Sequence, residues 1–137
     1  MTMPVQTNQS LSVDCAVFGF DGSVLRVLLI ERPDYNNLER LKLPGSMILE
    51  NETLPEAAVR VLETATGMKI RYLKQLEIFS DPKRVQGDEL AWIREKHGIQ
   101  TERVVTVGSY ALVKLDRQMV GNTTQRGARW VTIDEIQ

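Results

Sequence analysis

The chain has 137 residues, the length of one ordinary domain, and its 42% hydrophobic and 26% charged residues are typical of a soluble globular protein. Its net charge of -1 shows no basic excess, which argues against a free-standing nucleic-acid-binding protein. Because there is one cysteine, Cys15, and one histidine, His97, an internal disulfide and a zinc site of three or four Cys/His ligands are both excluded. Any metal would have to be held mainly by carboxylates.

Neither a membrane-spanning segment nor a secretion signal is evident. Apolar runs such as residues 27–30 are far shorter than the roughly 20 residues that cross a bilayer. Residues 1–10 are polar and lack the basic and apolar regions of a signal peptide. We therefore expect a cytoplasmic protein with no membrane contact, in which a flexible segment 1–10 precedes one domain over residues 11–137.

The predicted elements are mostly strands, because β-branched and aromatic residues gather in short runs. The predicted strands span residues 12–20, 24–31, 70–79, 103–115 and 129–133. The turn signal Asp21-Gly22-Ser23 joins the first two strands into a hairpin. A polar loop is expected over 33–40 and a short helix over 88–97, in which His97 would cap the helix end. With so few helices, the pattern favours an α+β fold over a doubly wound sheet.

The clearest helix is predicted over residues 54–66. Thr53 can act as its N-cap, Pro55 and Glu56 suit its first turn, and Gly67 ends it. Its apolar residues recur at helical spacing and so form one face. They are Leu54, Ala57, Ala58, Val61, Leu62 and Ala65.

The stretch 44–68 combines a loop, a turn and this helix with a fixed spacing of residues. Glu52 precedes Arg60 by eight residues, and Leu62, Gly67 and Met68 complete a set of five spaced positions. The pattern resembles the Nudix box of the MutT-like hydrolases. The opening hairpin, Leu-Pro-Gly before the box and a late Ala-Arg-Trp-Val strand extend the resemblance over nearly the whole chain. It implies the Nudix α/β/α sandwich, an α+β fold with a mixed sheet.

The departures from the box concern its metal ligands. The residues kept as scaffold are Gly45, Ser46 (at the family's glycine position), Glu52, Arg60 and Gly67. In the family, three glutamates hold Mg²⁺ against a substrate diphosphate, and here those positions are Val61, Thr64 and Ala65. Mg²⁺ requires anionic oxygen ligands, which valine and alanine do not supply and threonine supplies poorly. We therefore expect that the box keeps its structural role but has lost its catalytic role, with no catalytic residue, metal or cofactor. Glu52 and Arg60 would tie the loop to the helix.

Several short sequence segments also resemble those of the ligand-sensing domain of Nudix-related transcription regulators. They are Val-Asp-Cys-Ala-Val-Phe-Gly-Phe, Val-Leu-Leu-Ile-Glu-Arg, Arg-Val-Leu and Arg-Val-Val-Thr-Val-Gly-Ser-Tyr-Ala-Leu-Val. The resemblance implies a domain that binds ADP-ribose or a sugar-related effector without needing to cleave it. In that subfamily a winged-helix domain contacts DNA, so we expect such a domain beyond Gln137 and no nucleic-acid contact from this chain. A homodimer is an expectation from the resemblance alone.

Five residues are candidates for ligand binding. Arg32, Lys83, Arg84 and Arg103 could form the basic part of a pocket, since guanidinium groups suit phosphate oxygens. Asp81-Pro82-Lys83-Arg84 resembles the Asp-Pro-Arg turn of ADP-ribose-binding relatives. Tyr110 could stack on a base or sugar. The alternative is that each cation is a solvated strand-end charge and that Tyr110, like Cys15, belongs to the core.

Two further functions stay open. One is a Nudix hydrolase with displaced Mg²⁺ ligands, acting on a nucleoside diphosphate linked to another group. Glu63 is the nearest spare carboxylate, but it lies one residue, about 100° around a helix, from the first paired glutamate position. The other is a protein-interaction module with a vestigial pocket.

Overall fold

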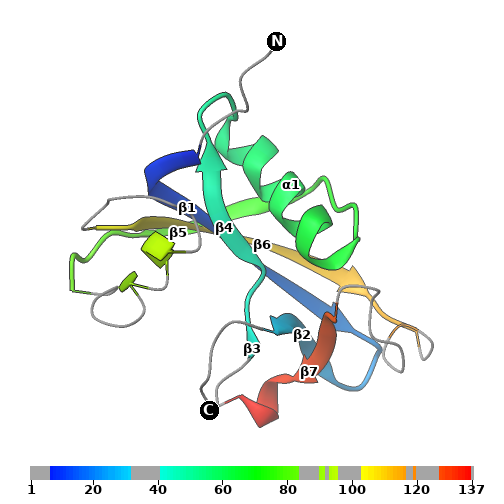
Figure 1. The fold of residues 1–137 in the computed structure, drawn as a ribbon. Coiled ribbons are helices and arrows are strands. Elements are labelled where there is room, and N and C mark those ends of the chain that lie inside the picture. Colours follow the sequence, from blue (N-terminus) through cyan, green and yellow to red (C-terminus); the bar gives the residue numbers. More distant parts are fainter. Residues whose placement is uncertain are drawn as a thin grey trace.

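One mixed sheet of seven strands carries the helix α1 on one face (Figure 1). The computed structural model describes residues 7–31, 41–83, 90–91, 93–95, 103–116, 119 and 127–136. The strands are β1 (Thr7–Phe20), β2 (Leu25–Glu31), β3 (Leu41–Lys42), β4 (Gly45–Leu49), β5 (Lys74–Phe79), β6 (Val105–Lys114) and β7 (Arg129–Thr132). The helices are α1 (Leu54–Thr66) and the 3-10 turn η1 (Ile133–Glu135). The α+β class, the mixed sheet and the helix at 54–66 are confirmed.

The long strand β1 organises the sheet. It pairs in parallel with β6 and antiparallel with β2 and β4, in the order β3-β2-β1-β6-β5, while β7 pairs with β2. The predicted hairpin is present, and Phe20 pairs with Leu25 across its turn. In that turn the Asp21 carboxylate accepts the N–H groups of Ser23 and Val24, each at 2.9 Å. These hydrogen bonds and one from Arg26 lower the pKa of Asp21 to about 2.

Several predicted strand boundaries differ from the structure, and two of them differ by four or more residues. β1 begins at Thr7, which pairs with Leu49 of β4, so residues 7–10 belong to the sheet and not to a flexible lead-in. Strand pairing is made by the backbone, and this polar stretch carries no apolar alternation that could have revealed it. β5 begins at Lys74 and not at residue 70, because Ile70 and Leu73 pack against the core instead of extending the strand.

Both ends of α1 are fixed by local hydrogen bonds. The Thr53 hydroxyl accepts the N–H of Glu56 at 3.3 Å, and the Glu56 carboxylate accepts the N–H of Thr53 at 2.9 Å. This reciprocal pair is a capping box. At the other end Gly67 has a φ of 80°, a left-handed conformation that favours glycine, and its N–H donates to the Glu63 carbonyl at 2.8 Å.

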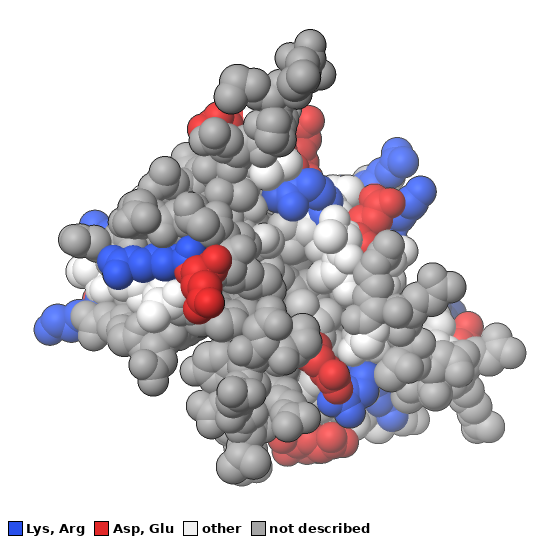
Figure 2. All heavy atoms as spheres, in the orientation of Figure 1, with Lys and Arg blue, Asp and Glu red and all other residues white. Residues whose placement is uncertain are grey.

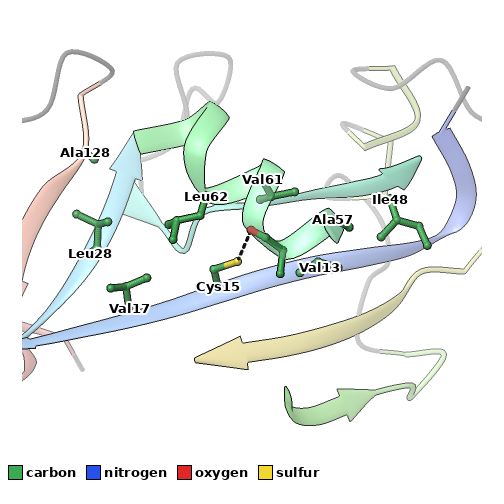
Figure 3. Close-up of a cluster of buried hydrophobic side chains, with 10 residues drawn as sticks. Val13, Cys15, Val17, Leu28, Ile48, Ala57, Val61, Leu62 and Ala128 are labelled. Carbon is green, nitrogen blue, oxygen red and sulfur yellow. Dashed lines mark hydrogen bonds between the residues drawn. The ribbon is translucent and has the colours of Figure 1, made fainter. Parts of the chain in front are cut away.

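The main core lies between α1 and the face of the sheet that it covers (Figure 3). Its buried members are Val13, Cys15, Val17, Leu28, Ile48, Ala57, Ala58, Val61, Leu62 and Ala128. The small Ala57 and Ala58 allow the helix to approach β1 closely. The Cys15 thiol donates to the Ala58 carbonyl at 3.5 Å, the dashed line in Figure 3. Burial raises the pKa of this thiol to about 12, with a smaller contribution from Asp14.

A second, smaller cluster packs on the opposite face. There the buried residues Met47 and Val104 contact Leu90 and Ile93. Residues 90–91 and 93–95 are helical, which agrees with part of the predicted helix 88–97. Trp92 and His97 of that helix, and the loop predicted over 33–40, lie outside the described residues. Within the described ranges, no helix has the length and apolar character needed to cross a membrane.

Candidate functional site

Glu52 and Arg60, eight residues apart in the sequence, form an ion pair in the structure. Arg60 Nε lies 2.5 Å from Glu52 Oε2, and Arg60 Nη2 lies 3.0 Å from Glu52 Oε1. The same Nη2 donates to the Met47 carbonyl at 3.1 Å, and Glu52 Oε1 also accepts the Leu49 N–H at 2.9 Å. Two charged groups thereby join the end of β4, the following turn and the middle of α1. This geometry is the loop-to-helix tie expected from the sequence.

The Glu52 carboxylate is largely buried, with a side-chain exposure of 11% against 31% for Arg60. Burial by itself raises the pKa of Glu52. The hydrogen bonds from Arg60 and from the Leu49 N–H outweigh burial, so its pKa lies below the ordinary value. The pair is therefore charged at neutral pH.

The first two residues of β4, Gly45 and Ser46, pair with β1. Gly45 pairs with Asp14, and a Cβ added at Gly45 would collide with the Asp14 carboxylate. A side chain at position 45 would have to displace the Asp14 carboxylate, and glycine avoids this. Ser46, at the family's glycine position, pairs with Val13 and is half-buried.

The three positions that carry metal ligands in the family differ in their burial here. Val61 is 2% exposed and belongs to the main core, Ala65 is half-buried, and Thr64 is exposed. None of them offers an anionic oxygen. In the described ranges, no group of three or more His, Cys, Asp or Glu side chains is close enough together to hold a metal ion. The residues that the structure describes thus fit a Mg²⁺ site poorly.

An open groove runs along the outward side of α1. Its volume is about 820 Å³, within the range of small-molecule sites. Its lining includes Pro55, Glu56, Arg60, Glu63, Thr64 and Arg71. Guanidinium, hydroxyl and carboxylate groups therefore converge there. Arg71 is not among the binding residues predicted from the sequence, which carries no local motif that marks it.

The structure brings together only part of the predicted ligand-binding set. Arg103 Nη2 donates to the Ser80 carbonyl at 2.6 Å, and Lys83 follows in the adjacent turn, where its N–H donates to Asp81 at 2.9 Å. Lys83 and Arg103 are both exposed at this end of the sheet. Arg32 and Arg84 lie outside the described residues.

Tyr110 lies elsewhere. It is half-buried in β6, where it pairs with Ala16 and Lys74. Seven residues separate it from Arg103, roughly 20 Å along an extended chain. Tyr110 and the Lys83–Arg103 end of the sheet are therefore separate features.

Charge on the visible face is mixed. Figure 2 shows Lys and Arg side chains interspersed with Asp and Glu over the described part of this face. No large basic patch gathers on that part, in keeping with the near-neutral net charge.

Comparison with known proteins decides the family. The model of the NUDIX domain matches residues 8–137. The chain belongs to the Nudix family. The match begins inside β1 and includes the Glu52–Arg60 tie and α1.

One relative of this Nudix domain is named as a transcriptional repressor. The ADPR responsive transcriptional repressor NtrR of Acinetobacter baylyi is 28% identical over 127 residues, which cover 91% of this chain and 45% of the relative. The chain thus spans less than half the length of that relative.

Solved structures share the fold. The NUDIX domain of Shewanella oneidensis NrtR, complexed with ADP ribose, superposes with a TM-score of 0.68 at 23% identity, covering 94% of this chain and 76% of that one. A MutT/nudix family protein from Enterococcus faecalis gives 0.65 at 24% identity, covering 96% of this chain and 47% of that one.

Proposed function

We propose that this Nudix domain is a non-hydrolytic sensor that binds an ADP-ribose-like nucleotide sugar, as the effector-binding part of a transcription regulator. One observation carries the proposal. The Glu52–Arg60 tie is intact, whereas the ligand positions on the same helix hold Val61, Thr64 and Ala65. Selection for hydrolysis would require the metal ligands, but selection for a binding scaffold requires only the tie.

The groove along α1 supports binding without a metal. Arg71 and Thr64 line it and can donate hydrogen bonds to phosphate oxygens. Glu63 lines it too and can accept hydrogen bonds from sugar hydroxyls. A diphosphate joined to a ribose presents both kinds of group. The exposed Lys83 and Arg103 form a second candidate contact for the same class of ligand.

The names of two relatives support the proposed ligand and the proposed role in regulation. It is named for its response to ADPR, and the S. oneidensis NUDIX domain is complexed with ADP ribose. On this proposal the DNA-contacting domain belongs to a longer protein, the domain acts in the cytoplasm, and no cofactor is required.

Isothermal titration calorimetry with ADP-ribose tests the proposal directly. We expect binding in EDTA, with an affinity that added Mg²⁺ changes little. Arg71→Ala should weaken binding at least tenfold if the groove holds the diphosphate, because a charge-assisted contact contributes about 1.5–3 kcal/mol. Arg129→Ala is the matched control, because Arg129 is an exposed arginine on β7, outside the groove.

Two results would contradict the proposal. The first is the absence of heat with ADP-ribose, and with ADP and ribose 5-phosphate as smaller probes. The second is Mg²⁺-dependent release of AMP from ADP-ribose that Glu63→Gln abolishes, which would establish the hydrolase with displaced ligands.

A further inference from the structure

The guanidinium of Arg60 has more hydrogen-bond donors than the tie to Glu52 uses. A guanidinium carries five N–H groups in a fixed plane. Nε and Nη2 donate to the Glu52 carboxylate, and Nη2 also donates to the Met47 carbonyl. Among the residues that the structure describes, the two N–H groups of Nη1 have no protein acceptor. Nη1 lies away from the edge of the plane that Nε and Nη2 present to Glu52, so these N–H groups are available to another partner.

These two N–H groups belong to a residue that lines the groove along α1. Arg60 is part of the groove lining, and 31% of its side chain is exposed. Because Glu52 and Met47 occupy Nε and Nη2, Nη1 is the part of the guanidinium that can meet a molecule in the groove. The same hydrogen bonds hold the guanidinium plane in place before a ligand arrives. A donor that is already fixed loses little conformational entropy on binding.

Arg71 supplies a second guanidinium to the groove. It is exposed, and within the described ranges it forms no hydrogen bond or ion pair. Two carboxylates also line the groove: Glu56 Oε1 accepts the Thr53 N–H, and Glu63 Oε1 lies 3.9 Å from Lys69 Nζ. These carboxylates repel anions, so an anion gains most where it contacts the guanidinium groups directly. Phosphate and diphosphate suit this arrangement, because several anionic oxygens lie close together in them.

We propose that Arg60 binds the ligand as well as tying the loop to the helix. Nη1 donates to a phosphate oxygen of the ligand while Nε and Nη2 hold Glu52. In the hydrolases that the box resembles, Mg²⁺ lies against the diphosphate, and here Arg60 and Arg71 supply the positive charge in its place. The inference rests on the proposed nucleotide-sugar ligand and names the residue that recognises its diphosphate.

A matched pair of variants separates ligand binding from the tie. Arg60→Gln removes Nη1 together with the positive charge. Glu52→Gln breaks the ion pair from its other side, but it leaves Nη1 in place and keeps a side-chain oxygen that can accept from Arg60. If Arg60 had only a structural role, the two variants would weaken ligand binding to a similar extent.

Isothermal titration calorimetry in EDTA measures the two affinities, with ADP-ribose and inorganic pyrophosphate as probes. We expect Arg60→Gln to weaken the binding of both probes at least tenfold, because it removes a charge-assisted contact. Glu52→Gln should bind both probes at least as tightly as the unaltered chain, because it removes a negative charge beside Arg60. Arg129→Gln, on β7 and outside the groove lining, should leave the affinities unchanged.

The outcomes distinguish this inference from the proposed function. If ADP-ribose binds and Arg60→Gln leaves its affinity unchanged, or if Arg60→Gln and Glu52→Gln cause equal losses, the inference is overturned and the proposed ligand stands. Binding of pyrophosphate through Arg60 without binding of ADP-ribose supports the inference and contradicts the proposed function. If neither probe binds, both are overturned.

Circular dichroism must show that each variant is folded. Should Arg60→Gln prevent folding, Arg60→Lys takes its place. Lysine keeps a positive charge beside Glu52, but its ammonium is a point charge that cannot present one edge to Glu52 and another to the ligand. Arg60→Lys should therefore still weaken the binding of both probes, and an unchanged affinity would overturn the inference.

Discussion

Replacing Arg60 with alanine should destabilise the fold more than its position on a helix surface suggests. The change removes both hydrogen bonds to Glu52 and the one to the Met47 carbonyl. The Glu52 carboxylate, 11% exposed, then keeps the hydrogen bond from the Leu49 N–H. Losing one partner of a fully buried ion pair costs about 3–5 kcal/mol. Because Arg60 is 31% exposed and water can reach the vacated space, we expect about 2–3 kcal/mol.

Urea unfolding followed by circular dichroism measures this loss at neutral pH. The matched control is Arg129→Ala, which breaks the exposed pair of Arg129 and Glu31 at 3.4 Å and should cost less than about 1 kcal/mol. Glu52→Gln should cost less than Arg60→Ala, because the charge left without its partner is then that of Arg60, which is more exposed than Glu52. If Arg60→Ala and Arg129→Ala proved equal within about 0.5 kcal/mol, the reasoning about burial would be refuted.

Acid should remove the contribution of the same pair. The pKa of Glu52 in the folded chain lies below its unfolded value near 4.5, so the carboxylate stabilises the fold above that pH. This stabilisation is lost as the pH falls through the lowered pKa. The stability gap between the unaltered chain and Arg60→Ala should therefore narrow below about pH 4.5, and a constant gap would contradict the assignment.

Three other changes test the core, the buried thiol and the helix end. Val61→Glu should destabilise the fold by about 3 kcal/mol or more in thermal unfolding, since it buries a carboxylate. Thr64→Glu, at an exposed position, should leave the stability nearly unchanged, and equal effects of the two changes would show that position 61 is not in the core. Cys15 should resist a thiol reagent at pH 8 until urea unfolds the chain, and rapid labelling of the native chain would contradict its burial. The free energy of unfolding should fall as the pH rises above 9, because the thiol ionises there in the unfolded chain but not in the folded chain, where its pKa is about 12. Gly67→Ala should cost about 1 kcal/mol in urea unfolding because of its positive φ, and an unchanged midpoint would argue against the left-handed cap.

The sequence predicted α1 to the residue, because its signals are local. The capping box of Thr53 and Glu56 and the stop at Gly67 lie within a turn of the bonds they make. The tie between Glu52 and Arg60 was also predictable, since a family motif fixes its spacing. Both features depend on residues close together in the chain.

The boundaries that failed depend on distant partners. The polar start of β1 is held by pairing with Leu49, and nothing in residues 7–10 indicates that partner. Similarly, residue 70 looked like the start of a strand because it is apolar, whereas the structure buries Ile70 against the core. Alternating apolar residues indicate buried positions, and such positions occur both in strands and in loops that pack against the core.

By itself, the sequence determined the family resemblance, the helix with its caps, and the absence of carboxylates at positions 61, 64 and 65. Only the tertiary structure decided that Val61 is a core residue, that Arg103 donates to the Ser80 carbonyl, and that Thr7 of β1 pairs with Leu49. The physical reason is that burial, long-range hydrogen bonds and strand register arise from contacts between residues far apart in the chain.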